Sequence, residues 1–342
     1  MKRHWLICAV VLAMGASAAQ ADVFSMGGGL TSLEFVTVGN PGNAPDTHGD
    51  GYGAVDYTYR MAKFEVTAGQ YTEFLNAVAD TDVHGLYDTD MWNQSLGCKI
   101  ERTGTPGNYS YTVATDRANR PVNYVSWGDA ARFCNWLTNA QPTGAQDLTT
   151  TEDGSYFLNG ATTDVQLQAV TRKTVEEGAR YLIPSEDEWY KAAYHKNDGV
   201  TGNYFDYPTG SNNVPSNDLI NPDPGNNANF RDGDYTIGHP YYLTEVGEFE
   251  NSESPYGTFD QGGNLWEWND WIAHSSYRGV RGGSYSDGAE ILHAGIRGYA
   301  LPGGAGELDD NGFRVTYIPE PATLSLLAAW LGAIWLKRRQ KA

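Results

Sequence analysis

Residues 260–271 read DQGGNLWEWNDW, and this stretch decides how the rest of the sequence is interpreted. It places three tryptophans and three carboxylates within twelve positions. Tryptophan side chains are largely buried in folded proteins, whereas a buried carboxylate needs a partner that offsets its lost hydration. The stretch therefore predicts a buried site in which a catalytic arrangement, a metal ion or packing alone holds the acids among the indoles.

The two ends of the sequence are predicted to be targeting segments. Residues 1–21 combine Lys2 and Arg3 with an apolar run and a small-x-small site at 19–21, which is typical of a secretory signal peptide cleaved before Asp22. An uncleaved N-terminal anchor is the alternative. The body of the chain, residues 22–318, contains no segment that reads as a linker, so we predict one domain there.

Residues 319–342 contain Pro319-Glu320-Pro321, the uncharged apolar run 322–336 and a basic tail. This arrangement resembles the PEP-CTERM sorting signal. The resemblance implies an exosortase as partner, an inner-membrane intermediate held by a transmembrane helix, and delivery to the envelope or exopolysaccharide of a Gram-negative bacterium. The run has 15 residues, fewer than the ~20 that span a bilayer, and an ordinary tail anchor is the alternative.

The formal net charge is −19, and a processed product of residues 22–320 would lack six of the basic residues and carry −25. A chain this acidic repels nucleic acid and anionic lipid, so we expect no nucleic-acid partner and membrane contact only through the C-terminal helix. A strongly negative charge also favours the binding of divalent cations, although the need for solubility explains much of this charge. Cys98 and Cys134 remain after export, and the sequence leaves open whether they form a disulfide.

Three segments are predicted to be helices because each opens with a capping pattern before apolar residues at helical spacing. These starts are Thr67-Ala-Gly-Gln70, Ser126-Trp-Gly-Asp129 and Ser185-Glu-Asp-Glu188. Short strands are predicted at 60–66, 180–183, 280–285 and 312–317. The long polar stretches 140–180 and 197–229 are predicted to be either disordered or ordered by something other than regular structure, such as a metal ion.

A family resemblance rests on six motifs, which in chain order are FEVTAGQY (64–71), RPVNYVSW (120–127), RYLIPSEDEWYKAAYH (180–195), GNLWEW (263–268), RGGSY (281–285) and NGFR (311–314). The series resembles the formylglycine-generating-enzyme-like (sulfatase-modifying-factor) domain. The resemblance implies a single α+β domain with little regular secondary structure, a variant of the C-type-lectin fold.

The resemblance also implies one or two calcium sites. The first would use the side chains of Asp260 and Glu267 and the carbonyls of Gly263 and Leu265, which are the kinds of oxygen that calcium binds. Trp266 and Trp268 would form its wall. The second would use Asn229, the carbonyl of Phe230 and an acid, either Asp232 or Asp234. The alternative for the first site is a surface turn flanked by core tryptophans.

The resemblance is to a domain that, in the formylglycine-generating enzyme itself, has two cysteines after the GGS motif. These cysteines bind Cu(I), which activates oxygen and oxidises a substrate cysteine to formylglycine. Here Asp287 and Leu292 occupy those positions. Because Cu(I) requires soft thiolate ligands, we expect no copper and no formylglycine-generating activity. The remaining candidates for other chemistry in the same cleft are Ser284, Asp287, His293 and Arg297.

The sequence thus predicts an exported, calcium-stabilised, non-catalytic module at the cell surface or in its matrix, with an unknown protein, peptide or glycan ligand. Two alternatives remain: an enzyme of a different reaction type that uses the same cleft, and a structural or adhesive protein of the envelope or exopolysaccharide.

Overall fold

The computed structural model describes residues 33–48, 51–273 and 276–320. The predicted signal peptide, Pro321 and the apolar run 322–336 lie outside this range. Within it, no helix is long and apolar enough to cross a membrane. The elements are short and separated by long irregular segments, so the predicted mixed α+β class is confirmed.

Two small four-stranded sheets form the centre of the fold. The first has the order β1-β2-β12-β5 and is antiparallel throughout, with bounds Phe35–Val38, Tyr59–Ala62, Thr316–Tyr317 and Tyr181–Leu182. The second has the order β10-β9-β8-β11, with bounds Gly298–Ala300, Arg278–Arg281, Trp266–Ile272 and Asn311–Gly312. Two hairpins lie apart from them: β3-β4 (Ile100–Thr103, Ser110–Val113) and β6-β7 (Arg231–Asp232, Asp234–Tyr235). The C-terminal strand β12 thus lies between β2, from the N-terminal part of the described chain, and β5, from its middle.

The helices are α1 (Ala68–Val78), α2 (Asp90–Asn93), α3 (Trp127–Thr138), α4 (Asp164–Ala169) and α5 (Glu186–Tyr194), with short 3-10 turns at Ala289–Leu292 and Gly304–Gly306. All three predicted capping boxes form, at Thr67, Ser126 and Ser185. A fourth, unpredicted box at Thr163 starts α4. In each, the hydroxyl accepts a backbone N–H of the first turn, which fixes the start of the helix.

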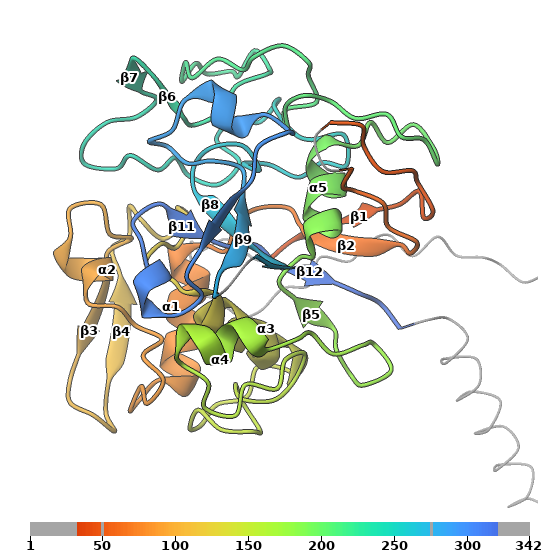
Figure 1. Cartoon of the computed structure of the whole chain (residues 1–342). Helices are drawn as coiled ribbons and strands as arrows, with labels where there is room; N and C mark the ends of the chain where they lie inside the picture. Colours follow the sequence, from red (N-terminus) through yellow and green to blue (C-terminus); the bar gives the residue numbers. More distant parts are fainter. Residues whose placement is uncertain (1–32, 49–50, 274–275, 321–342) are drawn as a thin grey trace, which may run out of the picture.

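The main core lies between α1, α3 and both sheets. Its centre is aromatic: the rings of Phe74 and Phe133 meet edge to face at 5.3 Å, and Phe133 meets Phe313 at 5.4 Å. Figure 1 places β8 and β9 in the middle of the molecule, with α3 and α4 at one end and the irregular segments of the 200–260 region at the other.

Side-chain amides and carboxylates order the long polar stretches. In 140–180, the Asn135 amide spans the carbonyls of Thr151 and Tyr156. In 197–229, the Asp223 carboxylate accepts hydrogen bonds from the Gly225 N–H, the Asn227 amide and the Ser252 hydroxyl. Such side-chain bonds replace the ladders of regular structure and satisfy the loop backbone.

Candidate functional site

Strand β8 carries Glu267 into the interior, where the side chain is fully buried. Arg314 binds it in a bidentate manner: Nε donates to Oε2 at 2.5 Å and Nη2 donates to Oε1 at 2.6 Å. The indole N–H of Trp189 in α5 donates to Oε2 at 2.7 Å. A buried charge pair of this geometry, with further hydrogen bonds, offsets the lost hydration of both groups.

The structure corrects the predicted tryptophan wall. Residues of a strand alternate between its two faces, so Trp266 and Trp268 lie on the opposite face of β8 from Glu267. The Trp268 indole N–H donates to the Val125 carbonyl at 3.0 Å, on the side of the main core. The indole that contacts Glu267 is that of Trp189, which the chain supplies from a helix 78 residues away.

Asp260 and Gly263 form the turn that leads into β8. Both have left-handed backbone, with φ of 60° and 79°. The Asp260 carboxylate accepts the N–H of Gly247 at 2.7 Å, and burial raises its pKa to about 6. A Cβ at Gly263 would lie 2.0 Å from the carbonyl oxygen of Asn229, so only glycine permits this approach. The segment holding the four predicted ligands of the first calcium site therefore packs directly against Asn229 of the second.

Glu65 joins this region, although the sequence placed it only in the predicted strand 60–66 and in the motif FEVTAGQY. It is 1 % exposed, and its Oε2 accepts the amide of Asn264 at 3.1 Å. Its Oε1 has no hydrogen-bond partner within the described part of the chain. Burial, followed by the charges of Asp260 and Glu267, raises the pKa of Glu65. The carboxyl groups of Glu65, Asp260 and Glu267 thus all interact electrostatically with the guanidinium of Arg314. A bound cation would relieve this excess of acidic groups.

Asn229 is also buried, and its amide N–H groups donate to the Tyr242 carbonyl and to Asn264 Oδ1. Its own Oδ1 is buried without a partner among the described residues, which suits a metal ligand. The Phe230 carbonyl accepts hydrogen bonds from Thr236 and Asn217. Asp232 and Asp234 face each other across the exposed β6-β7 hairpin. In residues 33–48, 51–273 and 276–320, no three His, Cys, Asp or Glu side chains cluster as a metal site.

The segment after the GGS motif holds a self-contained turn. The backbone N–H and the hydroxyl of Ser284 donate to Asp287 Oδ2 at 2.9 and 2.7 Å. Leu292 is fully buried and packs with Tyr207, Ala228 and Phe230. The two positions at which the resemblance places copper-binding cysteines therefore carry a hydrogen-bonded carboxylate and a core side chain.

The structure separates the four candidates for other chemistry. Ser284 contacts Asp287, as described above. The His293 ring meets Tyr207 and His48 edge to face at 5.5 and 5.8 Å, and the guanidinium of Arg297 stacks on Trp271 at 4.1 Å. His293 and Arg297 thus have aromatic partners of their own, whereas Ser284 and Asp287 bind each other.

Cys98 and Cys134 are both buried free thiols, which resolves the question that the sequence left open. Cys98 lies near the Asn123 carbonyl, whereas Cys134 lies within α3 in the main core. Burial raises the pKa of Cys98 to about 11 and raises that of Cys134 as well, so neither is a reactive thiolate near neutral pH.

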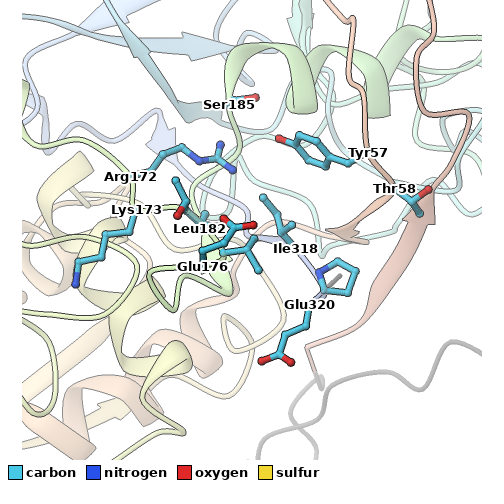
Figure 2. Close-up of a pocket in the computed structure, with 12 residues that line it drawn as sticks. Tyr57, Thr58, Arg172, Lys173, Glu176, Leu182, Ser185, Ile318 and Glu320 are labelled. Atoms are coloured by element: carbon cyan, nitrogen blue, oxygen red, sulfur yellow. The ribbon is translucent and has the colours of Figure 1, made fainter. Parts of the chain in front are cut away.

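The predicted sorting motif begins directly after the sheet. The Ile318 N–H donates to the Arg180 carbonyl at 3.0 Å, and the Arg180 guanidinium pairs with Glu320. Ile318, Pro319 and Glu320 line a cavity of 710 Å³ whose other walls include Tyr57, Arg172 and Leu182 (Figure 2). Cavities of this size accommodate small ligands or segments of larger ones.

Residues 51–317 match the sulfatase-modifying factor enzyme 1-like domain family. The chain belongs to this family. The match covers every motif on which the resemblance was based. No curated protein matches the sequence.

Several solved structures are similar to the chain at low sequence identity. The chain is similar to Treponema denticola variable protein 1, with a TM-score of 0.50 and 17 % identity over 87 % of this chain and 99 % of that one. It is also similar to CarF, with a TM-score of 0.48 and 20 % identity over 84 % of this chain and 99 % of that one. The values for PvdO from Pseudomonas aeruginosa are a TM-score of 0.47 and 16 % identity over 84 % of this chain and 95 % of that one. The similarity to the Treponema denticola protein shows a shared fold and nothing about function.

Proposed function

We propose that the chain is an exported, calcium-stabilised sulfatase-modifying-factor-like module that binds a ligand at the cell surface or in its matrix and does not generate formylglycine. The observation that carries the proposal is the pair Asp287 and Leu292. One is tied to Ser284 and the other is a buried apolar side chain. Two thiolates are what Cu(I) requires, and this loop offers none.

The test is an assay of the purified chain with Cu(I), oxygen and a cysteine-containing peptide, in which aldehyde is trapped with a hydrazide probe. We expect no aldehyde and no tight Cu(I) binding. The matched variant is the double substitution Asp287→Cys with Leu292→Cys, which restores two thiols and is expected to bind Cu(I). Aldehyde formation by the unmodified chain would overturn the proposal.

Calcium is the cation that the buried oxygens fit best. Asp260, Glu267 and the carbonyls of Gly263 and Leu265 would hold one ion, and the unpartnered Oδ1 of Asn229 supports a second. Carboxylate, amide and backbone oxygens together are a typical calcium ligand set, and bound calcium would neutralise the excess carboxylates around Arg314. The exposed positions of Asp232 and Asp234 leave the acid of the second site open.

Export also belongs to the proposal. The signal peptide at 1–21 and the PEP-CTERM-like segment 319–342 would take the chain through an inner-membrane intermediate to the outer envelope, with an exosortase acting near Pro319-Glu320-Pro321. Pulse–chase labelling of the cells would test this: a mature form that has lost both ends supports it, and a chain that keeps its C-terminus in the inner membrane contradicts it.

A further inference from the structure

Two cavities adjoin on the face of the molecule near the end of the first sheet. The 710 Å³ cavity of Figure 2 is one, and a second cavity of 440 Å³ lies beside Trp271, Ile272 and Asp270. Arg172 and Ser185 line both, so the two form one extended depression, which we call the Arg172 groove. A depression made of two joined cavities suits a segment of a polymer better than a single compact molecule.

Aromatic side chains lie in both halves of the groove. Tyr57 is 41 % exposed in the first half, and its hydroxyl donates to Glu188 at 2.5 Å, which fixes the ring. Trp271 is half-buried in the second half, and its ring is stacked against the guanidinium of Arg297. Two pre-set aromatic rings offer flat apolar surfaces at little entropic cost, and the C–H faces of sugar rings pack on such surfaces.

Most charges that line the groove are already paired within the protein. Arg172 binds Glu188 in a bidentate manner at 2.9 and 3.0 Å, and Asp270 binds Arg278 at 3.0 Å. Glu186 likewise binds Arg281. These paired groups keep lone pairs and N–H groups that can hydrogen-bond hydroxyls, but a charged ligand would have to disrupt the pairs. Because the chain as a whole is strongly acidic, an anionic polymer would also be repelled.

The groove is poorly suited to an extended peptide. Peptides that bind beside a sheet do so mainly by adding a strand to its edge. The edge here is β5, which has two residues, Tyr181 and Leu182, and therefore offers few backbone partners. A ligand whose polar groups are side hydroxyls needs no such edge.

From these observations we infer that the Arg172 groove binds an uncharged stretch of polysaccharide, with Tyr57 and Trp271 as the stacking surfaces of its two halves. The inference rests on the proposed function as a binding module and names the class of its ligand.

The experiment is affinity electrophoresis of the purified full chain in native gels, with a polyoxyethylene detergent that contains no sugar. The gels contain hydroxyethyl cellulose, soluble starch or laminarin as neutral polysaccharides, or alginate as an acidic one. We expect at least one neutral polymer to retard the chain. Trp271→Ala and Tyr57→Ala should each weaken this binding about tenfold or more, as buried aromatic anchors do. Trp271→Phe, which keeps a ring, should retain most of it.

Trp92→Ala is the matched control, because Trp92 is 39 % exposed on α2 and does not line the groove. It should bind as the unmodified chain does, and thermal unfolding should show that all variants are folded. The inference is overturned if no neutral polymer retards the chain, if only alginate does, or if Trp271→Ala binds like Trp92→Ala. It is also overturned if a synthetic peptide of residues 321–336 binds the groove and no polysaccharide does.

These outcomes separate the inference from the proposed function. Retardation that is insensitive to Trp271 and Tyr57 leaves a binding module with its ligand elsewhere. Aldehyde formation on a cysteine peptide overturns the proposed function whichever polymer binds.

Discussion

Glu267 and Asp287 lie in two adjoining regions that treat a carboxylate in opposite ways. The regions are directly hydrogen-bonded, since the Gly263 N–H donates to the Gly282 carbonyl and the Tyr285 N–H donates to the Asn264 carbonyl. Around Glu267, a guanidinium and an indole from distant parts of the chain hydrogen-bond the buried acid. Around Asp287, a half-buried acid is bonded by a serine three residues away. The difference teaches that the side chains that hold the acid of β8 in the interior are separate from those at the two positions where the resemblance places copper ligands.

The largest effect on stability is expected from a substitution that disrupts the region around Glu267. Arg314→Met removes the guanidinium and leaves Glu267 charged and buried, which costs about 3–5 kcal/mol in the free energy of unfolding. Urea denaturation at pH 7 measures it. The matched control is Lys63→Met, whose ammonium pairs with Glu34 at 3.7 Å on the surface, and such pairs contribute about 1 kcal/mol or less. Equal losses in the two variants would contradict the assigned role of Arg314.

Calcium sharpens the comparison, because in the described part of the chain buried side-chain oxygens without partners occur around Glu267, at Glu65 and Asn229, and not in the Ser284–Asp287 turn. An ion present at about 100 times its dissociation constant stabilises the folded state by about 2.7 kcal/mol, so EGTA should lower the unfolding midpoint by the corresponding amount. An unchanged midpoint in EGTA would remove calcium from the proposal.

The role of Glu65 is tested by the same measurement. Glu65→Gln should reduce the calcium-dependent shift, because it removes one of the three carboxyl groups around Arg314. Glu73→Gln is the control: its Oε2 is likewise buried without a partner in the described range, but it lies on α1, away from this cluster. If both variants respond to calcium as the unmodified chain does, Glu65 has no part in the site.

The local parts of this architecture could be predicted from sequence, and the non-local parts could not. Capping boxes involve residues three apart, so the starts of α1, α3 and α5 were predicted correctly. The box of α4 was missed because that helix has six residues and no apolar repeat. The position of β12 between β2 and β5 depends on pairings across most of the chain, which no local pattern specifies.

The candidate site divides in the same way. The turn from Asp260 to Glu267 could be identified within one motif. Its partners could not: Arg314 is 47 residues from Glu267, and Glu65 is 199 residues from Asn264. Spacing alone also failed to show that Trp266 and Trp268 face away from Glu267, since this follows from the alternation of a strand that the sequence analysis had not assigned.

The pH dependence of Asp260 should show a smaller effect. Burial raises its pKa from 3.8 to about 6, while the Gly247 N–H and Arg314 oppose the rise. A raised carboxyl pKa means that the folded state binds the proton more tightly, so this contribution to stability is complete below about pH 4 and is lost as the pH rises through 6. In EGTA, the unmodified chain should therefore lose stability relative to Asp260→Asn between pH 4 and 7. A difference that is independent of pH would contradict this, and added calcium should shrink it.

The smallest expected effect tests the second region. Asp287→Ala removes a half-buried carboxylate that accepts two hydrogen bonds from Ser284, and each such bond contributes about 0.5–1.5 kcal/mol. Ser284 is fully buried, but its hydroxyl keeps the hydroxyl of the exposed Ser286 as a partner at 3.0 Å, so we expect a net loss of about 1 kcal/mol in urea denaturation and an unchanged response to calcium. Ser284→Ala, which removes only the hydroxyl bond, should cost less. A loss as large as that of Arg314→Met, or one that depends on calcium, would mean that Asp287 belongs to the same charged core as Glu267, and the division between the two regions would then be wrong.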